Sequence, residues 1–529
     1  MKYTQTKIIL FVSLFFTLFD NYLFFEKTYA VFHNIYFVIS TGIILISVLV
    51  FLFNIILNRY TLKPILVILF IISSVATYFM QMYGTVIDDK MIQNIIETDI
   101  REVHDLLNLK LFIYIVILGV IPSIVLYKIE IIYKPLKEEL VDRIKYIIGS
   151  LIVIIISLFS FSKVYASFFR EHKSLRYYTN PTFYLYNLGK YINETYLKKP
   201  IPFKHIGMDA KIEETKKPKL IIFVLGEAAR YDHFSLNGYK RNTNPMLEKI
   251  SSLIDFPNVH SCGTETAVSV PCMFSPYDRS NYSDKKAKNT DSVIDVLNYA
   301  GVNILWRDND GGSKKVASRI KNYEDFNHDQ NKKYCDKSGC YDEILFVGLQ
   351  KWIYDINNSK PIFIVLHTKG SHGPAYYKRY PKKYEKFKPV CKTNQLQECK
   401  KEEVINAYDN TILYTDYILD KTIKLLKENE KKYQVAMYYI ADHGESLGEN
   451  GIYLHGLPYF IAPDVQKHPA SVSWFGKDFE INQTCVKKER FKHYTHDNIF
   501  STILGLVGIK TKEYKPEKDI FRKCYIKKE

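Results

Sequence analysis

Three apolar runs after residue 215 each end beside a side chain that can bind a metal ion or contact a phosphate. The residues after these runs are, in chain order, Glu227, His367 and the pair Asp442–His443. A carboxylate oxygen and an imidazole nitrogen at adjacent positions can both bind one Zn²⁺. Because an isolated Asp–His pair is as often structural as functional, the interpretation depends on finding Glu227 and a nucleophile with it.

A candidate nucleophile lies in the polar loop Ser261–Cys272, where Thr264 and Thr266 stand between two cysteines. The loop opens a predicted helix, and the N-terminus of a helix stabilises an anion. A nearby metal ion lowers the pKa of a hydroxyl and makes it a nucleophile. Either threonine would serve on chemistry alone. The alternative role of these hydroxyls is to cap the helix that follows.

An alternation of strands and helices would bring these side chains together. The predicted strands are Leu220–Leu225, Asn303–Trp306, Pro361–Leu366 and Val435–Ile440, and helix-like stretches between them include Asp291–Tyr299 and Glu403–Lys427. This alternation predicts a parallel α/β sheet that is buried on both faces. In such a sheet the ligand site lies beyond the carboxyl ends of the strands, where the candidate ligands follow.

The composition adds a membrane domain before this sheet. Of 529 residues, 47% are hydrophobic and 15% aromatic, which excludes a disordered or collagen-like chain. The apolar residues concentrate in the first third, in five stretches long enough, or nearly so, to cross ~30 Å of hydrocarbon. These are Ile8–Phe25, Ile35–Leu57, Pro64–Tyr83, Leu111–Tyr127 and Ile147–Tyr165. We interpret the first as an uncleaved anchor, because no small-residue cleavage site follows it.

The charges of the loops predict the orientation of these spans. Nine basic residues lie on the side of the N-terminus: Lys2, Lys7, Arg59, Lys63, Lys128, Lys134, Lys137, Arg143 and Lys145. The opposite loops hold four: Lys27, Lys90, Arg101 and Lys110. By the positive-inside rule the N-terminus is cytoplasmic, and everything after residue 165 lies outside. We expect a transmembrane domain over 1–165, an interfacial connector over 166–215 and an outer catalytic domain over 216–529. An ordinary linker with two helices explains the connector equally well.

The cysteines support an external location for the second half. All eight lie after residue 165, and six of them form close pairs along the chain. An even number confined to an external domain indicates disulfides. Zinc knuckles are the alternative, but they need CxxC-like spacing and reducing conditions. Our hypothesis for the pairing is Cys262–Cys272, Cys335–Cys340, Cys391–Cys399 and Cys485–Cys524.

Seven short segments, in order, resemble those of the phosphoethanolamine transferases, a family that includes the lipid A-modifying enzymes of polymyxin resistance. The segments are Gly226–Arg230, Cys262–Thr266, Ser269–Ser275, Trp306–Asp310, His372–Tyr376, Asn406–Asp409 and Asp442–Gly451. The resemblance is dense from about residue 218 to 456, has a further family-like run at His496–Asn498, and is sparser near the C-terminus. It implies an α-helical membrane domain of five transmembrane helices and an α/β alkaline-phosphatase-like periplasmic domain. It also implies one Zn²⁺, with a second left open, and the ligands Glu227, Thr266, Asp442 and His443.

The resemblance also assigns roles around the zinc. It selects Thr266 over Thr264 as the nucleophile, and Lys314 matches a lysine near the transferred phosphate. His372 and His455 match histidines around the phosphoethanolamine group or a second zinc. His367 is a weaker candidate, for which packing is an equally good explanation.

A second patch lies in the predicted outward loop between the third and fourth spans. Asn94, Thr98 and Glu102 are spaced at i, i+4 and i+8, which share one face of a helix. The family uses a similar set near the donor headgroup, so the resemblance implies that these residues bind substrate. Without it, an exposed amphipathic helix would be the preferred interpretation.

The chemistry implied by the resemblance is a double displacement. Zinc-activated Thr266 attacks phosphatidylethanolamine, releases diacylglycerol, and passes phosphoethanolamine to lipid A or another lipopolysaccharide acceptor. Lys314 and the metal offset charge on the phosphoryl oxygens, and His372 and His455 act as ligands or proton carriers. We expect a monomeric, multi-pass protein of the bacterial inner membrane that binds no nucleic acid and lowers susceptibility to polymyxin.

Several alternatives remain open at this point. A phosphoglycerol transferase of the same superfamily also uses a threonine, and phosphoethanolamine transfer to a core sugar or a protein would use nearly the same motifs. A sulfatase would need a Cys/Ser-x-Pro-x-Arg segment, which is not found at the nucleophile loop. A non-catalytic membrane receptor is disfavoured by the intact set of zinc ligands.

Overall fold

A computed structural model of the chain describes residues 2–98, 103, 105–197, 201–336, 338–356 and 359–526. Its contacts divide the chain into two compact units. The first comprises Met1–Ile95 and Leu107–Leu197, and the second Ile96–Leu106 and Lys198–Glu529. The boundary after Leu197 falls within the segment expected to be a connector. The segment Ile96–Leu106, from the predicted outward loop, belongs to the second unit with the sheet.

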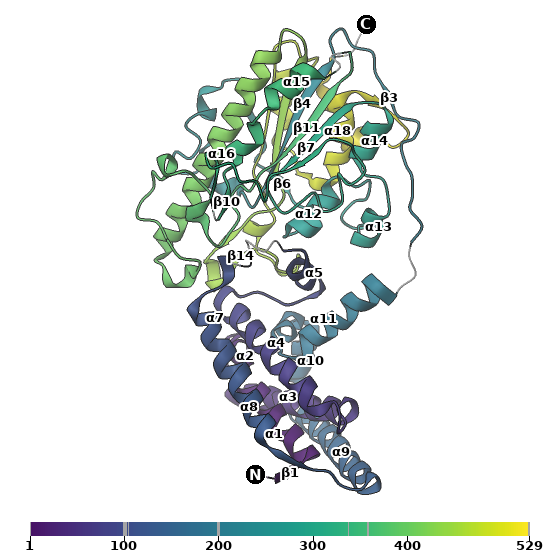
Figure 1. Ribbon diagram of the computed structural model, residues 1–529, viewed down its shortest axis with the longest axis vertical. Helices are drawn as coiled ribbons and strands as arrows, with labels where there is room; N and C mark the ends of the chain where they lie inside the picture. The colour runs from purple at the N-terminus through teal and green to yellow at the C-terminus, as the bar shows by residue number, and fades with distance from the viewer. Residues whose placement is uncertain are drawn as a thin grey trace. The chain divides into compact units, whose positions relative to one another are not determined.

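The first unit is helical (Figure 1). Four helical stretches are long and apolar enough to cross a membrane: α3 (Ile35–Ile56), α4 (Leu62–Tyr83), the run of α7, η1 and α8 over Leu109–Lys128, and α9 (Leu136–Ser160). A fifth crossing results if α1 (Gln5–Phe19) and α2 (Tyr22–Phe32), which meet at 59°, form one span. The described residues therefore contain four or five candidate spans, in agreement with the predicted membrane domain.

The bend between α1 and α2 differs from the prediction, which expected the first span to be one helix over Ile8–Phe25. The helix stops at Asp20, and Asn21 makes the break by bonding to two carbonyl groups. Its Nδ2 donates to the Phe16 carbonyl at 2.9 Å and to the Asn180 carbonyl at 2.6 Å. The Asn180 N–H in turn donates to Asn21 Oδ1 at 2.8 Å, so the Asn21 side-chain amide is satisfied through both its nitrogen and its oxygen.

The last predicted span, Ile147–Tyr165, is also displaced. Helix α9 begins earlier, at Leu136, and ends at Ser160; α10 (Ser162–Arg170) follows as a separate helix after Phe161. Pro135 precedes the first turn of α9, and acidic residues lie within that turn, where they interact favourably with the helix dipole. These charged residues hid the helix start from a prediction based on apolar runs.

The second unit is built on a seven-stranded sheet with the order β5–β15–β12–β4–β11–β7–β8. The strands are β4 (Lys219–Gly226), β5 (Ile254–Asp255), β7 (Asn303–Asp308), β8 (Tyr323–Asp325), β11 (Ile362–His367), β12 (Gln434–Ala441) and β15 (Ser471–Phe475). The five strands from β12 to β8 are parallel, whereas β15 is antiparallel to β12. The predicted parallel α/β sheet is therefore confirmed, and the carboxyl ends of its parallel strands lie along one edge.

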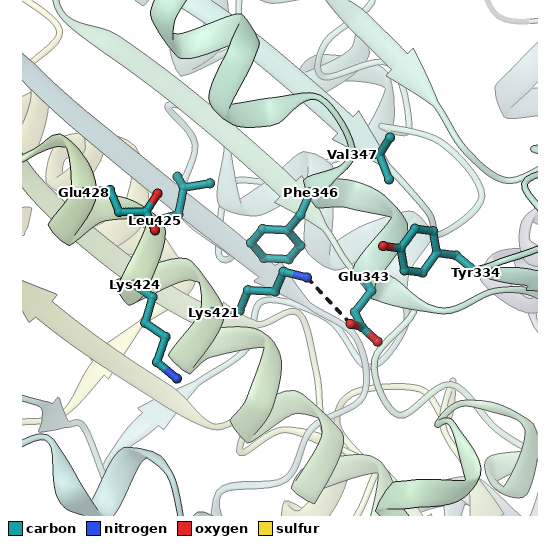
Figure 2. A pocket seen from close by; sticks show the side chains of 8 residues that line it. All are labelled: Tyr334, Glu343, Phe346, Val347, Lys421, Lys424, Leu425 and Glu428. Carbon is teal, nitrogen blue, oxygen red and sulfur yellow. Dashed lines mark ion pairs between the residues drawn. The ribbon is translucent and has the colours of Figure 1, made fainter.

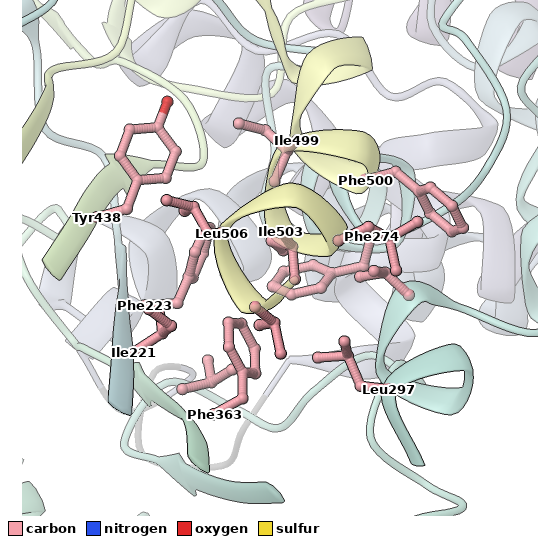
Figure 3. Packing of buried hydrophobic residues seen from close by; sticks show 14 of the residues in the cluster. Ile221, Phe223, Phe274, Leu297, Phe363, Tyr438, Ile499, Phe500, Ile503 and Leu506 are labelled. Atoms are coloured by element: carbon pink, nitrogen blue, oxygen red, sulfur yellow. The ribbon is translucent and has the colours of Figure 1, made fainter. Parts of the chain in front are cut away.

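Helices cover both faces of this sheet (Figure 1). Phe223 of β4 packs in one buried cluster with residues of α14 (Val293–Tyr299) and α18 (Ile499–Val507), as Figure 3 shows. Its neighbour Ile222 faces the opposite cluster, with residues of α15 (Leu349–Asp355) and α16 (Lys401–Asn429). Burial on both faces explains why β4 is apolar throughout rather than alternating. Each large side chain of this kind contributes about 1.5–3 kcal/mol on burial.

Four disulfides join the cysteines of the second unit. The pairs are Cys262–Cys272, Cys335–Cys340, Cys391–Cys399 and Cys485–Cys524, so the hypothesis for the pairing is confirmed. The first of them closes the loop that contains Thr266.

Candidate active site

The carboxyl ends of two neighbouring strands bring three of the predicted ligands together. In the pairing of β4 with β12, Gly226 lies opposite Ala441, so the residues that follow are Glu227 on one strand and Asp442 on the other. His443 comes next, and the side chains of Glu227, Asp442 and His443 are fully buried. Parallel pairing in this register therefore places three charged or polar groups at one point of the sheet edge.

The donor atoms of these three residues are spaced as metal ligands. His443 Nε2 lies 3.5 Å from Glu227 Oε1 and 3.4 Å from Asp442 Oδ2. None of these three atoms has a hydrogen-bond partner among the described residues. Donors at about 2.1 Å from a tetrahedral zinc ion would be about 3.4 Å apart. Because unsatisfied buried polar atoms are costly, the residues fit a divalent cation well.

Thr266 lies at this cluster and Thr264 does not. Thr266 is the first residue of α12 (Thr266–Met273), and its hydroxyl donates to Glu227 Oε2 at 2.9 Å. The Thr264 hydroxyl is buried and donates instead to the Leu457 carbonyl at 2.6 Å. The geometry therefore distinguishes two hydroxyls that chemistry alone left equivalent.

Burial and mutual repulsion control the ionisation of the cluster. Burial, with the nearby charges of Asp442 and Asp310, holds the pKa of Glu227 well above its usual value. Burial also opposes ionisation of Asp442, but its interactions with His443 and Glu227 hold its pKa below the usual value. Burial lowers the pKa of His443 to about 4, so its ring is neutral at pH 7 and can bind a metal. Two carboxylates in one buried site favour a cation between them.

A second group of potential ligands shares Glu227. Donor atoms of Glu227, His372 and His455 lie within 4.8 Å of one another. The rings of His443 and His455 have centroids 4.3 Å apart, so the two groups are adjacent. His455 Nδ1 lies 3.2 Å from Glu445 Oε2. Although burial lowers the pKa of His455, the carboxylates of Glu445, Asp442 and Asp310 together raise it more, and the net pKa lies above the usual value.

Comparison with known proteins adds to this geometry. A protein-family model described as phosphoethanolamine transferase EptA/EptB matches residues 45–196, and one described as sulfatase matches residues 219–509. Phosphoethanolamine transferase EptA of Escherichia coli K12 is 40% identical over 93% of this chain and 91% of its own. The chain belongs to the phosphoethanolamine transferase family. Phosphatidylethanolamine transferase Mcr-1 of Escherichia coli is likewise 40% identical, over 94% of each chain.

A solved structure agrees over the whole length of this transferase. It is the integral membrane protein lipooligosaccharide phosphoethanolamine transferase A (EptA) from Neisseria meningitidis, with a TM-score of 0.96, 33% identity and 100% coverage of both chains. The predicted family and fold class are confirmed. The protein is a transferase of the bacterial inner membrane, with an alkaline-phosphatase-like domain in the periplasm.

Two predicted residues of the transferase, His367 and Lys314, make their described hydrogen bonds outside the zinc-ligand cluster. His367 ends β11, and its Nδ1 lies 2.8 Å from Asp308 Oδ2. This buried contact orients the His367 ring, whose Nε2 has no hydrogen-bond partner among the described residues, and its role in the site stays a prediction. Lys314 follows β7 with a φ of 49°, and its ammonium donates to the Gly311 carbonyl at 2.9 Å. None of its described hydrogen bonds reaches Thr266.

The predicted headgroup residues fall at a boundary between the two units. Asn94 lies in α5 (Asp89–Glu97) and belongs to the first unit, whereas Thr98 belongs to the second. Glu102 lies outside the described residues. Their convergence on one ligand stays a prediction.

Sequence reasoning missed three residues that position the site. Glu445, which contacts His455, lies inside the Asp442–Gly451 segment but was given no role. His496 is buried and joins two parts of the site: its Nδ1 accepts from the Cys262 N–H at 3.2 Å, and its Nε2 donates to the Ala441 carbonyl at 3.3 Å. Only the family-like segment around His496 signalled it.

The third missed residue is Arg379, which connects His372 to the segment Ile96–Leu106. Arg379 Nε donates to the His372 carbonyl at 2.8 Å, and its Nη2 donates to Asp105 Oδ2 at 3.0 Å. Nothing in the spacing of the sequence predicts that residues so far apart meet. The contact exists because Ile96–Leu106 folds with the second unit.

A cavity elsewhere on the second unit is not this site. It has a volume of about 370 Å³ and lies between η7 (Asp342–Phe346) and α16, as Figure 2 shows. Its lining residues are Tyr334, Glu343, Phe346, Val347, Lys421, Lys424, Leu425 and Glu428. None of the predicted site residues lines it, so the chemistry belongs to the strand ends.

Proposed function

We propose that the protein transfers phosphoethanolamine from phosphatidylethanolamine to lipid A or another lipopolysaccharide acceptor, with Thr266 as the nucleophile. The observation that carries this proposal is the hydrogen bond from Thr266 to Glu227 within a buried set of metal ligands. The names of two relatives support the substrates. Mcr-1 is named a phosphatidylethanolamine transferase, and the Neisseria protein is named a lipooligosaccharide phosphoethanolamine transferase.

Four residues would hold the zinc ion: Glu227, Thr266, Asp442 and His443. When bound, Zn²⁺ would supply Lewis-acid chemistry, lowering the pKa of the Thr266 hydroxyl and offsetting negative charge on the phosphoryl group. Donor spacing and neutral His443 both support this ligand set. His372 and His455, with the shared Glu227, are the candidate ligands for a second ion.

In the first step the Thr266 oxygen attacks the phosphorus of phosphatidylethanolamine. Its proton is directed at Glu227 Oε2, which lies 2.9 Å away. The bond between phosphorus and the diacylglycerol oxygen breaks, and His455 supplies the proton that the leaving oxygen needs. Glu445 supports this role, because it contacts Nδ1 and so leaves Nε2 as the nitrogen that would carry the proton.

In the second step an acceptor oxygen attacks the same phosphorus. His455 takes the proton of the acceptor hydroxyl, the bond to Thr266 breaks, and Thr266 regains its proton from Glu227, so that phosphoethanolamine is left on the acceptor. Lys314 would stabilise charge on the phosphoryl oxygens, once its ammonium leaves the Gly311 carbonyl. Asn94, Thr98 and Glu102 would bind the donor headgroup, with Glu102 against the ethanolamine ammonium.

The same reaction would lower susceptibility to polymyxin. Each transferred group places a primary ammonium beside lipid A phosphates and reduces the negative charge of the surface. A cationic peptide is then attracted less strongly.

Mass spectrometry of lipid A from a Gram-negative host tests this function. Expression of the protein should yield a species heavier by one phosphoethanolamine, and Thr266→Ala should abolish it. Thr264→Ala is the matched control and should keep the modification, because that hydroxyl bonds to a carbonyl outside the cluster. Normal transfer by Thr266→Ala would refute the nucleophile. Unchanged lipid A with diacylglycerol still released would move the acceptor to a core sugar or a protein.

A further inference from the structure

A second cluster of metal-binding side chains lies outside the site described above. It consists of His260, Asp464 and His468, whose donor atoms lie within 4.8 Å of one another. His260 ends β6 (Val259–His260) and directly precedes the loop that contains Thr266. Asp464 and His468 lie four residues apart before β15. The cluster therefore joins two separate segments of the second unit.

The distances within this cluster resemble those of the zinc ligands more than those of hydrogen-bonded pairs. His260 Nε2 lies 3.3 Å from Asp464 Oδ1, and His468 Nδ1 lies 3.3 Å from Asp464 Oδ2. Hydrogen bonds from nitrogen to oxygen are usually ~2.7–3.2 Å. Three other His–Asp pairs lie within that range, with 2.6 Å for His233–Asp409, 2.8 Å for His367–Asp308 and 3.1 Å for His205–Asp291. The second nitrogen of His367 lies outside it, at 3.6 Å from Asp310 Oδ2. A tetrahedral zinc ion would hold its donors about 3.4 Å apart.

A hydrogen bond fixes the orientation of His468 for metal binding. Its Nε2 lies 2.9 Å from the Pro257 carbonyl, which accepts, so Nε2 carries the proton. The lone pair of the neutral ring is then on Nδ1, the atom that faces Asp464. The ring also stacks on Tyr231, with centroids 3.5 Å apart, and its side chain is 9% exposed. Such contacts to the non-ligating nitrogen are typical of metal-binding histidines.

The second histidine is held close to the first. The rings of His260 and His468 are stacked, with centroids 4.5 Å apart. A third imidazole is near: the centroid of His493 lies 5.0 Å from that of His260. His493 Nδ1 lies 3.2 Å from Asn258 Oδ1, which leaves Nε2 as its ligating atom. Three donors are thus in place, and the fourth position is open to water or to His493.

We propose that His260, Asp464 and His468 form a separate binding site for a borderline divalent cation such as Zn²⁺. Two imidazoles and one carboxylate are the donors that this class of ion prefers. The ion would clamp the segment that enters the Thr266 loop onto the segment before β15. These segments already meet at the backbone, where the Ser261 N–H donates to the Lys467 carbonyl at 2.8 Å. The clamp would hold the position of the nucleophile loop without contacting substrate.

Zinc counting on the full-length protein in detergent tests this proposal. The protein is dialysed to equilibrium against a zinc buffer, and zinc per chain is measured by mass spectrometry of the metal. His260→Ala and Asp464→Asn should each bind one zinc fewer than the wild type. His205→Ala is the matched control, because His205 also faces an aspartate but has no second histidine in its group. It should bind as much zinc as the wild type.

A variant of the first site separates the two sites. Glu227→Gln should lose zinc at the Thr266 site yet keep the zinc that His260→Ala loses, and the double variant should lose both. Circular dichroism and thermal melting show whether each variant is folded. If His260→Ala does not fold, Asp464→Asn takes its place in the comparison. Equal zinc content in the wild type, His260→Ala and Asp464→Asn would overturn the proposal. So would loss of the same single zinc in Glu227→Gln and His260→Ala.

Discussion

Glu227 contacts the candidate nucleophile with one carboxylate oxygen and a candidate metal ligand with the other. Its Oε2 accepts from the Thr266 hydroxyl at 2.9 Å, and its Oε1 lies 3.5 Å from His443 Nε2. The three residues come from the end of β4, the start of α12 and the loop after β12. A single buried carboxylate thus connects three elements. Removing its charge by substitution is therefore a direct test of the site.

Replacement of Glu227 should affect zinc binding and stability in opposite directions. Because burial and Asp442 raise the pKa of Glu227, its ionised form destabilises the metal-free fold at neutral pH. Glu227→Gln should therefore raise the melting temperature of the metal-free protein. It should also weaken zinc binding by more than the ~10–100-fold typical of losing an outer contact. Chelator competition and melting curves measure both effects. Unchanged zinc affinity in Glu227→Gln would remove Glu227 from the ligand set. Glu248→Gln, at an exposed position, is the control and should change neither zinc affinity nor melting temperature.

Arg379 should affect activity through His372. Arg379 contacts both the His372 carbonyl and Asp105, whereas its neighbour Lys378 forms an ion pair with Asp105 alone. Arg379→Lys should lower transfer by up to ~100-fold, the cost of misplacing a catalytic group by about 1 Å. Zinc at the Thr266 site should stay bound. Lys378→Ala, the matched control, should keep most of its activity. Equal losses in the two variants would place the effect in the Asp105 contact.

The disulfide Cys262–Cys272 should matter for activity more than for stability. It closes a separation of 10 residues around Thr266, whereas Cys485–Cys524 closes 39. Loop-closure entropy predicts losses of about 3 and about 4 kcal/mol when they are removed. Replacing Cys262 and Cys272 by serine should still abolish most transfer, because the nucleophile loop loses its constraint. Replacing Cys485 and Cys524 by serine should lower the melting temperature, but the folded fraction of that variant should keep its activity. If the variant without Cys262–Cys272 kept its activity and the variant without Cys485–Cys524 lost it, other contacts would hold the Thr266 loop.

His496 should make stability depend on pH. Burial lowers the pKa of His496 to about 4, from 6.5 in the unfolded chain. The folded state then binds fewer protons between pH 6.5 and 4, so the free energy of unfolding falls as the pH drops through this window. The full effect is about 3 kcal/mol. The His496→Gln variant should be less stable than the wild type at pH 7. Its free energy of unfolding should change less between pH 6.5 and pH 4. Melting temperatures of the metal-free wild type and His496→Gln, measured as a function of pH, test this prediction. Parallel pH curves for the two proteins would contradict it.

Patterns local in sequence were the ones that could be predicted. The run Leu220–Leu225 is apolar throughout because β4 is buried on both faces, and its strand was predicted within two residues. The four disulfides were paired correctly, since three of them close short loops. The break within the first span was not predicted, because there the Asn21 side chain bonds to the Asn180 carbonyl, 159 residues away. No window of sequence contains that contact.

The sequence by itself determined the composition of the site. Residues after buried strands, an apolar first third and family-like segments were sufficient to predict Glu227, Asp442 and His443, because parallel strands end at one edge. The family-like segments also selected Thr266 over Thr264, but only the tertiary structure gave the physical reason for that choice and showed which groups support the site. Thr264 and Thr266 have the same chemistry and differ by two positions, and the turn into α12 directs one to Leu457 and the other to Glu227. Such choices depend on contacts between distant segments, and these form only when the chain folds.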